Sequence, residues 1–125
     1  MQETRSITCD VITQFLPEQS LASEDRFTFA YQITITNTGS ETMQLRNRYW
    51  LITDGNGAEQ EVSGPGVIGE EPILASGVAF TYTSGAVLTT PVGTMQGHYE
   101  FENRHGELLK APIPLFSLAV ANVVN

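Results

Sequence analysis

The sequence contains one pattern that other proteins use to bind phosphate: three glycines spaced as G-x-G-x-x-G, in the segment Gly64-Pro65-Gly66-Val67-Ile68-Gly69. In dinucleotide-binding folds the glycines let the backbone approach a pyrophosphate, and a helix that begins directly after them binds the phosphates at its N-terminus. Here Gly69 is followed by Glu70-Glu71-Pro72, and the next glycine, Gly77, comes too early for a helix of useful length. The pattern therefore lacks the helix on which its chemistry depends.

The residues around these glycines favour a structural role for them. Two glutamates directly after the motif would repel a phosphate, and no lysine or arginine occurs between Arg48 and Arg104. We predict an ordered loop or irregular edge between two strands, reversed at Gly66 and Gly69 and without a following helix, and keep a phosphate-binding backbone nest as the alternative. If the loop contacts a protein, its two apolar residues should be partly exposed. The residues that would contact a ligand or partner are Gly64, Gly66, Val67, Ile68 and Gly69.

A second candidate is nucleophilic catalysis. Ser84 precedes a glycine, and His98 or His105 could be drawn as its base. However, the local order Tyr82-Thr83-Ser84-Gly85 is not the G-x-S-x-G turn that exposes a hydrolase serine. His98 falls on the polar face of its expected strand, and His105 lies in an expected turn. We therefore predict two exposed histidines and no catalytic site.

Metal binding is the third candidate. Cys9, His98 and His105 do not have the spacing of a zinc-ligand cluster. Cys9 alternates with apolar residues, which predicts a small buried hydrophobic side chain. Two pairs of glutamates, each on one strand face, could hold Mg²⁺ or Co²⁺ weakly, although a solvated face is the simpler interpretation. These pairs are Glu59 with Glu61 and Glu100 with Glu102. We predict no cofactor and no metal centre.

Composition and charge exclude several classes of function. The chain has 125 residues, 41% of them hydrophobic, which suits one domain with its own core. Its net charge is −8 and only six residues are Lys or Arg, so we expect no binding to nucleic acid. No apolar run approaches the ~20 residues of a membrane helix, and we see no secretory signal. The single cysteine excludes an internal disulfide, so we expect a cytoplasmic protein.

The candidate residues must be positioned by β-strands, because apolar and polar residues alternate with a period of two along most of the chain. In residues 26–36 every odd position from Phe27 to Ile35 is apolar or aromatic, which predicts a strand packed on one face. Residues 43–53 predict another strand, with one set of apolar and aromatic side chains on each of its two faces. Asp54-Gly55-Asn56-Gly57 predicts a hairpin turn after it. The two sets are Leu45, Tyr49 and Leu51 on one face, and Trp50 and Ile52 on the other.

Further short strands follow the same pattern, and no stretch has a sustained helical period. Pro112 and Pro114 predict a strand edge or a crossover before the last strand. Together the strands number seven or eight, which predicts an antiparallel β-sandwich. We expect one domain, with a core of about residues 7–120 and a loose tail at 121–125. The further strands are expected at residues 7–15, 59–62, 78–83, 95–101, 107–110 and 115–120.

Several motifs in a fixed order resemble one protein family. The first two motifs are Phe29-Ala30-Tyr31-Gln32-Ile33-Thr34-Ile35 and Arg48-Tyr49-Trp50-Leu51-Ile52-Thr53-Asp54. After them come the glycine motif, Tyr82-Thr83-Ser84-Gly85 and Pro91-Val92-Gly93-Thr94-Met95-Gln96-Gly97-His98-Tyr99. This order resembles the ApaG family, also called CorD, over about residues 7–120. The chain departs from the family pattern at Tyr49, often His, and at Ala86, often Cys, so neither position is expected to be catalytic or to bind metal.

The resemblance implies a fold and a class of function. The fold would be an immunoglobulin or fibronectin type III-like sandwich. Members are small bacterial proteins, and similar domains in eukaryotic F-box and polymerase-delta-interacting proteins look like interaction modules. The family names derive from an operon shared with a dinucleoside-tetraphosphate hydrolase and from cobalt and magnesium phenotypes. The resemblance thus implies a non-enzymatic interaction module that binds a protein partner and is associated with cobalt and magnesium homeostasis. The alternative is a protein that binds nucleotide pyrophosphate or a divalent cation through the Gly64 to Gly69 loop.

Overall fold

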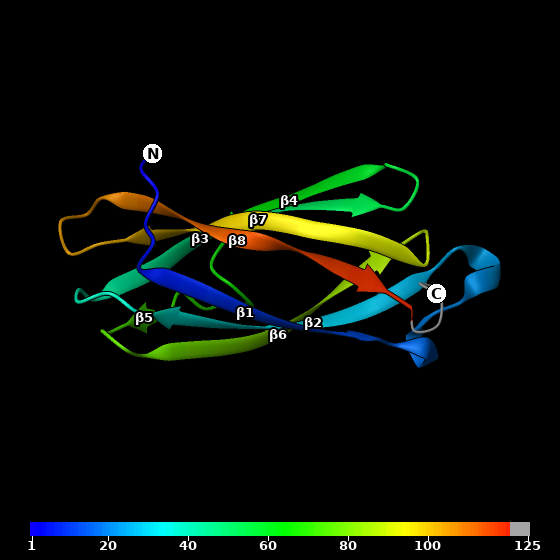
Figure 1. The fold of residues 1–125 in the computed structure, drawn as a ribbon, viewed down its shortest axis with the longest axis horizontal. Coiled ribbons are helices and arrows are strands. Elements are labelled where there is room, and N and C mark those ends of the chain that lie inside the picture. Colours follow the sequence, from blue (N-terminus) through cyan, green and yellow to red (C-terminus); the bar gives the residue numbers. More distant parts are fainter. Residues whose placement is uncertain (121–125) are drawn as a thin grey trace.

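The computed structural model describes residues 1–120, which form two antiparallel sheets packed face to face (Figure 1). The predicted tail, residues 121–125, lies outside the described residues. The three-stranded sheet has the order β1 (Ile7–Phe15), β2 (Phe27–Asn37) and β6 (Ala79–Leu88). The larger sheet has the order β4 (Glu59–Pro65), β3 (Met43–Asp54), β7 (Val92–Glu102) and β8 (Leu108–Ala119), with the short strand β5 (Ile73–Leu74) paired to β3. The predicted antiparallel sandwich is confirmed.

Strand β2 confirms the predicted alternation. Phe29, Ile33 and Ile35 are completely buried, because their side chains all point from one face of β2 into the space between the sheets. Trp50 of β3 reaches the same space from the opposite sheet, and its ring lies 5.5 Å from that of Tyr31, edge to face. The predicted place of the single tryptophan in the core is therefore also confirmed.

Strand β3 contains a bulge that the sequence pattern does not reveal. The prediction that Leu45 shares a face with Tyr49 and Leu51 is wrong, because the pairing of β3 with β7 shifts register between Leu45 and Asn47. The extra residue reverses which positions point inward. Leu45 is therefore completely buried on the same side as Trp50, while Tyr49 lies on the outer face.

The last part of the chain forms one strand where the sequence predicted two. Strand β8 runs without interruption through Pro112 and Pro114, and it is an edge strand, as the prolines indicated. A proline can occupy an edge because its missing N–H need not pair on the open side. A register shift between Met95 and Gly97 of β7 accommodates the irregular backbone of β8. Strands β4 and β6 also extend beyond their predicted ends.

The connections contain almost no helix. The helices of residues 1–120 are two 3₁₀ turns, Pro17–Gln19 and Ala22–Glu24, and none is long and apolar enough to cross a membrane. Cys9 of β1 is half-buried, and burial raises the pKa of its thiol to about 12. Its thiol therefore stays protonated near neutral pH, as expected of a packing residue rather than a nucleophile or metal ligand.

Candidate functional site

The glycine motif begins with Gly64 and Pro65, the last two residues of β4, and continues as a tight hairpin-like loop. Val67 and Glu70 exchange two backbone hydrogen bonds of 2.8 and 2.9 Å, with Ile68 and Gly69 between them at positive φ angles of 42° and 79°. Gly66 also has a positive φ, 62°, and its N–H donates to the carbonyl of Arg46 at 2.8 Å. The predicted ordered loop, with no helix after Gly69, is confirmed.

The two apolar residues of the loop have different environments. Val67 is completely buried and belongs to the core, whereas the side chain of Ile68 is 56% exposed. The expectation that a partner-binding loop would expose both residues is therefore wrong for Val67. This residue anchors the loop to the domain, which leaves Ile68 as the apolar contact point at its tip.

The polar groups of the loop do not form a cradle of free donors. The N–H groups of Gly66, Val67 and Glu70 are all used in backbone hydrogen bonds. The guanidinium of Arg48 donates to the carbonyls of Pro65 and Gly66, at 2.9 and 3.0 Å. An anion-binding nest needs several free N–H groups that converge on one point, so this arrangement favours a structural role for the loop.

Sequence reasoning missed the proximity of Arg48 to the glycine loop. Arg48 lies opposite Gly64 in the pairing of β3 with β4, and its guanidinium passes over that glycine. The strand register, and not closeness along the chain, brings them together.

Two glycine substitutions separate packing from backbone strain in this loop. We expect Gly66→Ala to cost about 2 kcal/mol more of unfolding free energy than Gly69→Ala. Both positions have positive φ, but a Cβ at Gly66 would overlap the carbonyl oxygen of Glu70, whereas a Cβ at Gly69 would meet open space. Urea denaturation of the two variants measures the difference; equal losses would mean that φ alone sets the cost.

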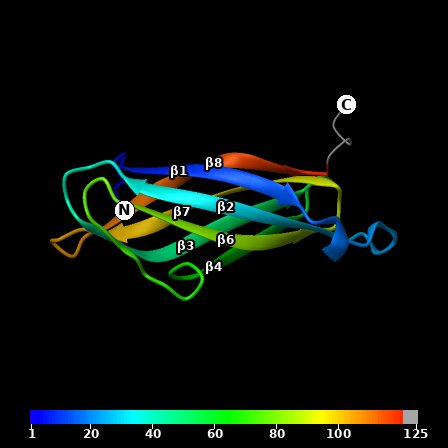
Figure 2. The same cartoon turned by 90° about the horizontal axis from the view of Figure 1, so that it is seen from below.

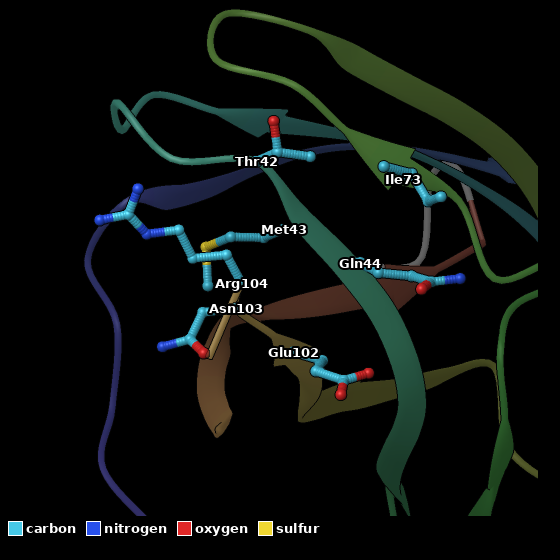
Figure 3. A pocket seen from close by; sticks show the side chains of 7 residues that line it. All are labelled: Thr42, Met43, Gln44, Ile73, Glu102, Asn103 and Arg104. Atoms are coloured by element: carbon cyan, nitrogen blue, oxygen red, sulfur yellow. The ribbon is translucent and has the colours of Figure 1, made fainter. Parts of the chain in front are cut away.

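A shallow groove follows the outer face of the larger sheet beside this loop. Three hollows of about 280, 360 and 390 Å³ lie next to one another along it, because neighbouring hollows share Glu102 or share Asn47 and Pro65. We call this surface the sheet groove. Figure 3 shows its first hollow, where Ile73 and Glu102 come from the two strands that pair with β3 at Gln44. Ile73 is 64% exposed and is the main apolar contact point at this end.

The middle of the sheet groove is fixed by ion pairs. Arg46 at the β3 bulge donates from Nε to Glu102 at 2.7 Å and from Nη1 to Glu71 at 3.1 Å. Exposed pairs of this kind add little stability. Arg46 offsets part of the charge of the two carboxylates, and the bulge places it where it can reach both.

The far end of the sheet groove holds a stacked aromatic pair. The rings of Tyr49 and His98 lie opposite each other on β3 and β7, with centroids 5.2 Å apart and planes inclined by 26°. The Tyr49 hydroxyl donates to Glu61 at 3.0 Å, and the amide of Asn47 donates to Glu100 at 2.8 Å. The nearby carboxylate of Glu61 raises the pKa of Tyr49, so its hydroxyl remains a donor at neutral pH. The result is an aromatic surface bordered by acidic side chains.

His98 should make stability depend on pH. Partial burial, and then the charge of Lys110, lower its pKa. The unfolded chain therefore binds this proton more readily, and we expect stability to fall as pH decreases through the ordinary histidine pKa of about 6.5. His98→Gln should remove this part of the slope in urea titrations at several pH values. An NMR titration that places the His98 pKa at or above its ordinary value would contradict the expectation.

The structure does not assemble the other candidate sites. Ser84 lies on the inward-facing side of β6 with Tyr82 and Ala86, whereas His98 lies on the outer face of the opposite sheet and His105 in the turn after β7. The predicted exposure is confirmed for His105 and wrong for His98, which is half-buried because it stacks on Tyr49. Residues 1–120 contain no group of three or more His, Cys, Asp or Glu side chains that could hold a metal ion. Of the paired glutamates, Glu61 is bound by Tyr49 and Glu102 by Arg46.

The fold and this surface define a class of protein: an immunoglobulin or fibronectin type III-like β-sandwich with a polar groove on its larger sheet. The ApaG domain model matches residues 17–103. The chain is 52% identical over 124 residues to protein ApaG of Acidithiobacillus ferrooxidans (strain ATCC 53993 / BNL-5-31), covering 99% of this chain and 98% of the relative. The chain belongs to the ApaG family.

Further comparisons agree with this assignment. Protein ApaG of Erwinia tasmaniensis is 46% identical over 125 residues, the full length of both chains. The crystal structure of the putative ApaA protein from Bordetella pertussis superposes with a TM-score of 0.91 at 43% identity, covering 98% of this chain and 100% of that one. The predicted family and fold class are therefore confirmed.

Proposed function

We propose that the chain is a non-enzymatic protein-interaction module that binds its partner through the sheet groove. The arrangement of the groove carries this proposal, because one sheet face brings together an exposed isoleucine, an arginine paired with two carboxylates and a stacked aromatic pair. Protein interfaces use such central apolar and aromatic contacts with a polar rim. The single cysteine excludes an internal disulfide, which is the usual situation in a reducing compartment, so we place the interaction in the cytoplasm.

The charges favour a partner that presents a basic segment to the Tyr49 end of the groove. Glu61 and Glu100 border the aromatic pair, and the whole chain carries a net charge of −8. An arginine or lysine of the partner could stack on Tyr49 and approach both carboxylates. Complementary charge of this kind mainly accelerates association and makes it sensitive to salt.

Crosslinked affinity capture from the native cell tests the proposal when it compares defined variants. We expect Tyr49→Ala and Ile73→Ala each to reduce recovery of the captured partner by about tenfold or more. Gln32→Ala is the matched control, because Gln32 is exposed on the outer face of the other sheet. Recovery that is unchanged in both groove variants would contradict the proposal.

The alternative function, binding of nucleotide pyrophosphate or a divalent cation at the Gly64 to Gly69 loop, requires a separate experiment. ATP, pyrophosphate, Mg²⁺ and Co²⁺ are added one at a time in thermal unfolding. A specific ligand should stabilise the chain by about 2.7 kcal/mol at a hundredfold excess over its Kd. We expect no saturable shift with any of them, because the N–H groups of Gly66, Val67 and Glu70 are used in backbone hydrogen bonds. A saturable shift that Gly66→Ala removes, in conditions where the variant is folded, would favour the alternative.

A further inference from the structure

Strand β6 is an edge strand without the usual protection against pairing. It is ten residues long, it contains neither a charged residue nor a proline, and its pairing with β2 has no register shift. Edge strands are normally blocked by charges, prolines, bulges or short length, since their unpaired N–H and C=O groups can bind another strand. By these criteria β6 is open to strand addition.

The other long edge strands each carry such protection. Strand β8 contains Pro112 and Pro114, and its Lys110 exchanges backbone hydrogen bonds with residues 2 and 4. Strand β4 is seven residues long and includes Glu59 and Glu61. Strand β1 carries Asp10 and lies beside β8. The lack of protection is therefore particular to β6 among the long edges of residues 1–120.

The backbone of β6 offers alternate residues for pairing. The hydrogen bond from Asn37 N–H to the carbonyl of Val78, 3.0 Å, shows that even-numbered residues face β2 at this end. The alternation of an antiparallel pair then directs the N–H and C=O groups of odd-numbered residues away from β2. All of these residues are exposed, and β2 is the only strand that pairs with β6 in residues 1–120. They are Ala79, Thr81, Thr83, Gly85 and Val87.

The larger sheet leaves space for a strand beside β6. Strand β4 extends past β6 on that side (Figure 2), so part of its inner face has no strand of the opposite sheet over it. Gln60 and Val62 lie opposite the buried residues Ile52 and Trp50, and so face inward, yet Gln60 is exposed and Val62 only half-buried. An added strand would cover both.

We propose that β6 binds an extended segment of a partner protein as a fourth strand of the smaller sheet. The segment should be free of proline and acidic residues, with apolar side chains at alternate positions that pack over Val62. A second copy of this chain fits less well, because antiparallel pairing of two β6 strands would bring each projecting β4 against the larger sheet of the other copy. This site uses the free edge of β6, whereas the groove contacts proposed above centre on Tyr49 and Ile73, so substitutions can test each by itself.

Peptide selection and hydrogen exchange test this inference. A displayed library of random ten-residue peptides is selected on the folded chain, and the best binder is synthesised. We expect it to slow amide exchange at Thr81, Thr83 and Gly85, which should exchange faster than Tyr82 and Ser84 in the free chain. If no peptide is selected, or if protection appears only in the sheet groove, the proposal is wrong.

A proline substitution provides the matched test of mechanism. Thr83→Pro removes an N–H that faces away from β2, so the native ladder can remain. We expect this variant to bind the selected peptide about tenfold more weakly, or worse. Thr83→Val keeps the N–H and should bind like the original chain. Equal binding of both folded variants would overturn the proposal. The exchange map of the unmodified chain decides the question even if the proline variant does not fold.

Discussion

Replacing Phe29 with alanine is expected to lower the free energy of unfolding by about 3–5 kcal/mol. Phe29 is completely buried on the inner face of β2, and its ring centroid lies 5.4 Å from that of Phe15. Truncation removes apolar contacts and leaves a cavity that the two sheets cannot close without disturbing both ladders. Urea denaturation monitored by the fluorescence of Trp50 measures the loss.

Phe27→Ala is the control for this prediction. Phe27 lies on the same strand and the same face, but it is only half-buried at the end of β2. We expect a clearly smaller loss, because less buried area disappears and the end of the sheet can relax. Equal losses for the two phenylalanines would mean that the degree of burial does not determine the loss of unfolding free energy.

Replacing Gly97 with alanine is expected to lower the free energy of unfolding by about 3 kcal/mol or more. Gly97 lies in β7 between β3 and β8, and a Cβ there would overlap the carbonyl oxygen of Tyr49 and lie 2.9 Å from its carbonyl carbon. These are backbone atoms of a central strand and cannot rotate away. Chemical denaturation measures the loss of stability, and crosslinked capture shows whether the groove is also disturbed.

Gly85→Ala controls for the general cost of replacing a strand glycine. A Cβ at Gly85 has an ordinary contact of 3.4 Å with the carbonyl of Phe29, and the position is exposed on β6. We expect little change or a small gain in stability. If Gly97→Ala were as mild, β3 and β7 would not be held as close as the structure has them.

The strands were predictable where one period of two continued without interruption. Strand β2 is the clearest example, since its inward positions are apolar from Phe27 to Ile35. The prediction failed at the β3 bulge, because a bulge depends on the partner strand and leaves no mark in the local pattern. It failed again at β8, where prolines usually indicate an interruption, but the open edge tolerates them.

The sheet groove could not be predicted for a related reason. Its lining residues come from five strands and from the segments that connect them, so the strand registers bring them together. The glycine motif was the strongest local signal, and it led to the correct loop. It did not indicate Tyr49 and His98, whose stacking requires that β3 and β7 be neighbours.

The strand order also has a consequence for the rate at which the chain folds. Phe27 pairs with Leu88 and Gln44 pairs with Glu102, so the central ladders of both sheets join distant parts of the chain. Such pairings require large loops to close before any contact is gained, and sandwiches of this type fold in milliseconds to seconds rather than microseconds. The β3–β4 and β7–β8 hairpins can form earlier. Each sheet is therefore completed late, when its two distant halves meet.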